Sequence, residues 1–106
     1  MENEIKIVNY GDISFNIDGR MAHCNEIEIK LTKTEFEVLK YFFQNIGRAI
    51  SREELLNSVW GFYCAIETRA TDDIVKRLRR KLSAVNSTVY ITTLYGYGFR
   101  MDNKAR

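Results

Sequence analysis

The first thirty residues alternate between apolar and polar side chains with a period of two. This alternation is typical of half-buried β-strands, whose successive side chains point to opposite faces. Asp18-Gly19 lies between two alternating runs and is a strong signal for a short hairpin. The pattern predicts an antiparallel meander of three or four strands within residues 1–31. Its apolar positions are Ile5, Ile7, Ile13, Phe15, Ile17, Ile27, Ile29 and Leu31.

The period then changes to that of an amphipathic helix. Thr32-Lys33-Thr34-Glu35 has the form of a capping box, in which the side chain at each end accepts the backbone N–H of the other. The apolar spacing that follows predicts a helix to about Asn45. Ser51-Arg52-Glu53-Glu54 has the same form and predicts a second helix that ends at Gly61. We expect residues 61–67 to form a loop.

The third predicted helix, residues 68–84, has two contrasting sides. One side carries an apolar stripe of Thr71, Val75, Leu78 and Leu82, flanked by Arg79 and Lys81. The opposite side carries Arg69, Asp73, Lys76, Arg77 and Arg80. Such a helix suits the major groove of DNA, where Arg pairs with guanine and flanking cations neutralise phosphates. A surface helix with a solubilising basic face is the alternative.

The C-terminal segment predicts a β-hairpin over residues 89–102. Its two strands flank Tyr95-Gly96-Tyr97-Gly98, whose glycines permit the positive φ of a tight turn. We expect Tyr90, Tyr97 and Phe99 to pack this hairpin onto the helices. The element order, a sheet at 1–31, a helical core at 32–84 and a hairpin, predicts an α+β fold of the winged helix-turn-helix kind.

The length of the chain limits the number of domains, and its charge distribution indicates the kind of partner that it binds. A chain of 106 residues supports a single domain spanning 1–106. Residues 1–67 carry seven basic and eleven acidic side chains, whereas residues 68–106 carry nine and three. This asymmetry indicates a polyanionic partner for the C-terminal part.

Other classes of protein find little support in the sequence. Asp72 and Asp73 do not have the spacing of a catalytic pair, and His23 lies in the strand region. Cys24 and Cys64 form no metal-binding motif, so we expect two reduced thiols, no cofactor, no metal and no enzyme. No apolar run reaches the ~20 residues that span a bilayer, and no signal peptide is visible, so a cytoplasmic protein without membrane contact is expected.

Four segments resemble the OmpR/PhoB-type winged-helix output domains of two-component response regulators. They occur in the order of that family: LTKTEFEVLKYF (31–42), ISREELLNSVWG (50–61), TRATDDIVKRLRRKL (68–82) and ITTLYGYGF (91–99). With the N-terminal meander, the resemblance covers nearly the whole chain. It implies a sheet packed on three helices, a hairpin wing and a role as the DNA-binding part of a bacterial transcription regulator.

The resemblance also implies roles for particular residues. In the third helix, Arg69, Lys76, Arg77 and Arg80 match positions that contact DNA in the major groove. Thr93 and Tyr95 match wing positions that meet the backbone or the minor groove. The loop 61–67 matches a segment that touches RNA polymerase in related activators. Members usually bind direct repeats of double-stranded DNA as head-to-tail dimers. We expect a receiver domain in the full-length protein, with a stand-alone regulator as the alternative.

The chain departs from the family pattern at three positions. Tyr95 stands where many members have Arg, and either donates its hydroxyl to a phosphate or packs. Ile74 stands where His is common, which removes a phosphate contact. Asp73 replaces a smaller or apolar residue; it either accepts from cytosine N4 or, as we favour, pairs with a neighbouring cation (Arg69, Lys76 or Arg77) and orients it.

Two other functions stay open from the sequence alone. A winged helix can serve as a protein-interaction module, although such a module has no need of a basic helix face. A nonspecific nucleic-acid binder, of RNA or of DNA, would carry the same charge but show no sequence preference.

Overall fold

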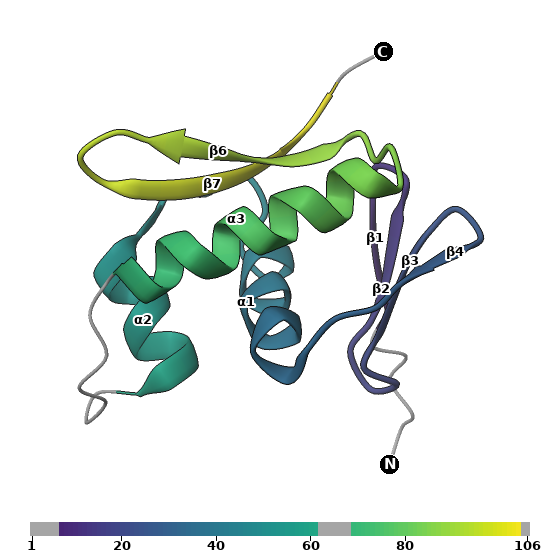
Figure 1. Cartoon of the computed structure of the whole chain (residues 1–106), viewed down its shortest axis with the longest axis horizontal. Helices are drawn as coiled ribbons and strands as arrows, with labels where there is room; N and C mark the ends of the chain where they lie inside the picture. The colour runs from purple at the N-terminus through teal and green to yellow at the C-terminus, as the bar shows by residue number, and fades with distance from the viewer. Residues whose placement is uncertain (1–6, 62–68, 105–106) are drawn as a thin grey trace.

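The computed structural model of the chain describes residues 7–61 and 69–104. In Figure 1, a four-stranded sheet lies at one end, three helices lie beside it, and the C-terminal hairpin runs alongside the third helix. In chain order the elements are β1 (Ile7–Tyr10), β2 (Ile13–Asn16), β3 (Met21–Cys24), β4 (Ile27–Ile29), α1 (Lys33–Phe43), β5 (Ile50–Ser51), α2 (Arg52–Trp60), α3 (Arg69–Ala84), β6 (Val89–Leu94) and β7 (Gly98–Asn103). The predicted fold class is confirmed.

The N-terminal sheet has the predicted meander order, β1-β2-β3-β4, with every pair antiparallel. Its inner face buries Ile13, Phe15, Ala22, Cys24 and Ile29. We expected the apolar position Ile7 to lie on the buried face of its strand, and this was wrong. Ile7 is 43% exposed, while Val8 and Tyr10 pack against the core. The pairing with β2 explains this: Val8 lies opposite the buried Phe15 and therefore shares its face.

Helix α1 begins with the predicted capping box. The Thr32 N–H donates to a Glu35 carboxylate oxygen at 2.9 Å, and the Glu35 N–H donates to the Thr32 hydroxyl at 3.2 Å. The helix ends at Phe43, two residues before the predicted end. Phe15 of the sheet stacks on Phe36 and on Phe43, with ring centroids 4.8 Å apart in both pairs. These contacts join the N-terminal sheet to the helices.

Helix α2 has only half of its predicted capping box. The Ser51 hydroxyl accepts the Glu54 N–H at 3.0 Å, but the Glu54 carboxylate does not reach back. It accepts instead from the Arg48 guanidinium and the Tyr41 hydroxyl. A charge-assisted bond to a guanidinium is stronger than one to a backbone amide, so Glu54 turns towards Arg48. The helix stops at Gly61 as predicted, at a φ of 95°.

The second sheet contains the predicted hairpin and one strand that the sequence did not predict. Its order is β5-β7-β6, and β5 has only two residues, Ile50 and Ser51. Phe99 is buried as expected, but Tyr90 is 41% and Tyr97 50% exposed, so their predicted packing was wrong. Tyr90 alternates with buried neighbours in β6 and therefore faces outwards. Tyr97 lies in the turn.

A single cluster of buried apolar side chains connects both sheets and the three helices. At its edge, Asp12 of the β1–β2 turn accepts from the Ser87 hydroxyl at 2.7 Å and from the Thr88 N–H at 2.9 Å. These bonds attach the N-terminal sheet to the segment between α3 and β6. Within the described ranges, no helix has the length and apolar character needed to cross a bilayer.

Candidate nucleic-acid interface

Helix α3 has the two sides that the sequence predicts. Its buried residues are Thr71, Ile74, Val75, Leu78 and Leu82. Its predicted DNA-facing residues, Arg69, Asp73, Lys76, Arg77 and Arg80, are all exposed. The structure therefore brings four cations and one carboxylate together on one open face. Ile74 is only 6% exposed and packs inwards, so it leaves the polar face to its neighbours.

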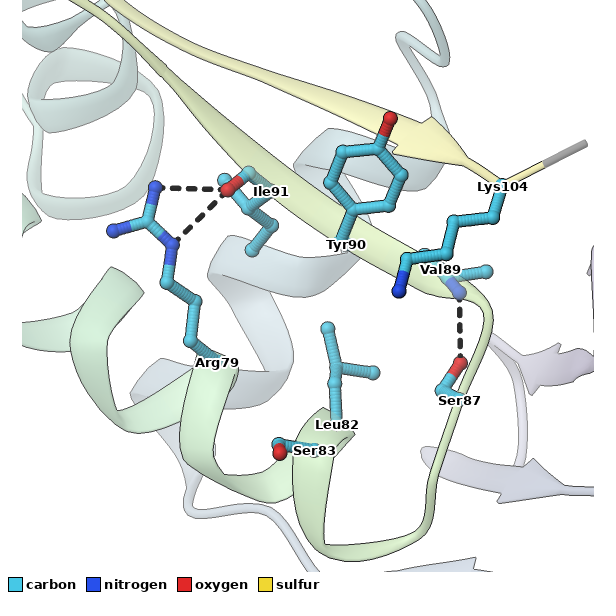
Figure 2. A pocket seen from close by; sticks show the side chains of 8 residues that line it. All are labelled: Arg79, Leu82, Ser83, Ser87, Val89, Tyr90, Ile91 and Lys104. Atoms are coloured by element: carbon cyan, nitrogen blue, oxygen red, sulfur yellow. Dashed lines mark hydrogen bonds between the residues drawn. The ribbon is translucent and has the colours of Figure 1, made fainter.

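Arg79 joins α3 to the hairpin. Its guanidinium donates to the Ile91 carbonyl oxygen at 3.0 and 2.8 Å, as Figure 2 shows, and to the Thr93 hydroxyl at 2.6 Å. The same group lies 6.0 Å from the centre of the Phe99 ring. Arg79 was expected to offer its charge to phosphates. It instead satisfies a strand carbonyl and sets the position of the hairpin relative to α3.

Lys81, the second flanking cation, also has internal partners. Its ammonium donates to the Lys30 carbonyl oxygen at 2.7 Å and to the buried carboxylate of Glu35. Burial acts to raise the pKa of Glu35. Hydrogen bonds from Lys81 and from the Thr32 backbone lower the pKa by more than burial raises it, so that it stays below the ordinary value. The ion pair fixes α3 against the start of α1, and the flanking phosphate contact expected of Lys81 is not supported.

Arg52 connects three elements around the start of α3. Its guanidinium donates to the Asp72 carboxylate at 2.8 Å and lies 4.8 Å from the centre of the Phe99 ring. Its backbone N–H donates to the Tyr97 carbonyl oxygen at 3.2 Å. The first turns of α2 and α3 and the hairpin turn are thus joined through one residue. Sequence reasoning missed this role, because the partners lie 20 and more positions away.

The two predicted wing residues lie in different surroundings. Thr93 is half-buried, and its hydroxyl oxygen accepts from Arg79, which leaves the hydroxyl hydrogen to be donated elsewhere. Tyr95 is 93% exposed in the turn between β6 and β7. The alternative in which Tyr95 packs is therefore wrong, and its hydroxyl faces solvent at the end of the hairpin.

Asp73 lacks the partner that we favoured for it. Within residues 7–61 and 69–104, no ion pair or hydrogen bond links it to Arg69, Lys76 or Arg77. The interpretation that Asp73 orients a neighbouring cation is therefore not supported.

Two hollows border the exposed face of α3. One, of about 270 Å³, lies between the helices and the hairpin and is lined by Arg52, Asp72, Asp73, Lys76, Arg79, Thr93 and Phe99. The other, of about 370 Å³, includes Trp60 of α2, Asp73 and Arg77. In the described part of the chain, no group of three or more His, Cys, Asp and Glu side chains is placed to hold a metal ion. The arrangement offers a polyanion an open cationic helix beside an exposed hairpin turn.

Helices α1 and α2, the half-exposed helix α3 and the β6–β7 hairpin define a winged-helix domain. Residues 26–101 match the family described as "Transcriptional regulatory protein, C terminal". The chain belongs to this family and is an OmpR/PhoB-type output domain. The family comprises transcription regulators and not enzymes.

Individual relatives agree with this assignment. The chain is 35% identical to the transcriptional regulatory protein PrrA of Mycobacterium tuberculosis over 92 aligned residues. These residues make up 87% of this chain and 40% of PrrA. The chain is also 35% identical to the DNA-binding domain of Bacillus subtilis CssR, with a TM-score of 0.75 over 85% of this chain and 99% of that one. The AdeR DNA-binding domain, solved in complex with an intercistronic region, is 25% identical, with a TM-score of 0.81 over 91% of this chain and 99% of that one. The chain thus spans about two fifths of the length of the curated relatives that it matches.

Proposed function

We propose that the chain binds double-stranded DNA sequence-specifically, as the output domain of a bacterial response regulator. In this proposal α3 lies in the major groove, where Arg69, Lys76, Arg77 and Arg80 contact base edges and phosphates. The observation that carries it is the exposure of these four cations on one side of a helix whose other side is buried. The major groove admits one such helix, and Arg matches the paired acceptors of guanine.

The hairpin is the proposed second contact. The hydroxyl groups of Thr93 and Tyr95 are both able to donate to phosphate oxygens. Arg79 holds the hairpin against α3 through the Ile91 carbonyl, so helix and wing meet DNA as one rigid surface. Tyr95 carries no charge, so we expect less attraction to a narrow minor groove than an Arg would give.

Selection from a random duplex library tests this function. We expect enrichment of one motif, in two direct-repeat half-sites about one helical turn apart. Affinity should fall steeply with salt, because the bound phosphates release counterions. Binding without an enriched motif would favour a nonspecific nucleic-acid binder. No binding at low salt would favour a protein-interaction module.

Replacing Arg77 with Ala is expected to weaken binding to the selected site about tenfold, ~1.4 kcal/mol, and to relax the preference at one base position. Titration of labelled duplexes by fluorescence anisotropy measures both effects. Lys30→Ala is the matched control, since it removes one exposed positive charge outside α3; it should change affinity less than twofold. An equal loss for Arg77→Ala on selected and random duplexes would mean that Arg77 contacts only phosphate.

Further parts of the proposal concern the whole protein. Because this chain matches only about two fifths of the length of its curated relatives, we propose that the full-length protein also has a receiver domain. We propose a cytoplasmic location for the full-length protein. The expected contact with RNA polymerase falls on the loop 61–67, of which residues 62–67 lie outside the described residues. It stays a prediction.

A further inference from the structure

Asp73 places a carboxylate at the centre of the basic side of α3. At about 100° per residue, Asp73 and Arg80 project within about 20° of each other, with Lys76 and Arg77 on either side. All four residues are exposed. A residue at the centre of a helix face is the one that points most directly at the floor of a groove into which the helix is laid.

The neighbouring carboxylate shows what Asp73 does not do. Asp72 pairs with Arg52 at 2.8 Å and so has a role inside the protein. No such contact is found for Asp73 with any of the residues that the structure describes, and the segment 62–68, FYCAIET, contains no basic residue. The Asp73 oxygens are therefore available to accept hydrogen bonds from a bound molecule.

Only one kind of group in DNA suits a carboxylate at this place. A phosphate would repel it. Removing a carboxylate from water without a new hydrogen bond is unfavourable, so it must find a donor. The major groove presents two amino donors, N4 of cytosine and N6 of adenine. The amino group of adenine lies between two acceptors, its own N7 and O4 of the paired thymine, and either would repel the second carboxylate oxygen. The amino group of cytosine has an acceptor, O6 of the paired guanine, on one side only.

We propose that Asp73 reads sequence by accepting a hydrogen bond from N4 of a cytosine at one position of each half-site. This inference rests on the proposed function, because it requires α3 in the major groove. It makes Asp73 a specificity-determining residue. The surrounding cations supply the affinity that lets a negative side chain approach DNA.

The test compares motifs selected from a random duplex library by the wild type, Asp73→Asn and Asp73→Ala. The wild type should prefer cytosine at one half-site position by about tenfold. Asp73→Asn should change that preference to adenine, because an amide pairs with N6 and N7 together, and Asp73→Ala should abolish it. All other positions should keep their preference. Asp18→Asn, in an exposed turn of the N-terminal sheet, removes the same charge and should select the wild-type motif.

A second measurement isolates the hydrogen bond. Placing N4-methylcytosine at the assigned position removes the donor from the groove and keeps the base pair. It should weaken the wild type about tenfold and leave Asp73→Ala unchanged. If the wild type and Asp73→Asn select the same motif, Asp73 reads no base, although the proposed function stands. If the wild type selects no motif at all, both the proposed function and this inference are wrong.

Discussion

Replacing Gly98 with Ala is expected to lower the free energy of unfolding by about 4 kcal/mol, among the largest losses for a single substitution. A Cβ atom at Gly98 would lie 2.0 Å from the Ile50 carbonyl oxygen and 2.8 Å from the Ser51 Cα. Both are backbone atoms of β5 and cannot move aside as a flexible side chain does. Because Ser51 also caps α2, displacing β5 disturbs the start of that helix.

Gly96→Ala provides the matched control in the same hairpin. Gly96 has a φ of 79°, but a Cβ atom there would meet no heavy atom within 4 Å. Its cost is therefore the conformational strain alone, about 1 kcal/mol. Urea unfolding followed by circular dichroism measures both variants. Equal losses would mean that the backbone of β5 moves aside at little cost. They would contradict our expectation that the close packing of β5 on β7 at Gly98 stabilises the fold.

Periodicity predicted those elements in which it persists over several turns or strand residues. The Thr32 capping box and the stripe from Thr71 to Leu82 are local patterns, and the structure contains both. Strand β5 was not predicted, because two residues are too few to show an alternation of apolar and polar side chains. Its existence depends on pairing with Gly98, 47 positions beyond Ser51.

The errors have the same physical origin. Which face of β1 is buried depends on its register with β2, and the Glu54 carboxylate turns to two partners outside its own helix, Arg48 and Tyr41. For the candidate site, helical geometry was sufficient to place the exposed residues of α3, but it left open whether Tyr95 of the hairpin turn packs. It could not place Arg52 or predict that Arg79 binds the hairpin, since these contacts form only when distant segments fold together.

Removing the ammonium group of Lys81 is the second large effect that we expect. In Lys81→Met, the buried Glu35 carboxylate, whose side chain is 3% exposed, loses the cation that compensates its burial. Breaking a buried pair from one side costs roughly 3–5 kcal/mol. Lys81 itself is about one-third exposed, so water offers partial compensation. We therefore expect a loss of about 3 kcal/mol at pH 7, measured by urea unfolding. Lys40→Met breaks a half-buried pair with Glu37, whose carboxylate keeps Arg20 as a second partner, and should cost less than 1 kcal/mol.

The pH dependence of this loss distinguishes an ion pair from simple packing. The pKa of Glu35 is lowered in the folded protein, so its ionised form stabilises the fold above the unfolded value of about 4.3. That stability disappears as the pH falls through the lower, folded pKa. Over a range that runs from pH 7 to below the folded pKa of Glu35, the wild type should therefore lose its advantage over Lys81→Met. A difference that stays constant over this range would mean that the methylene stem of Lys81, and not its charge, supports the junction of α1 and α3.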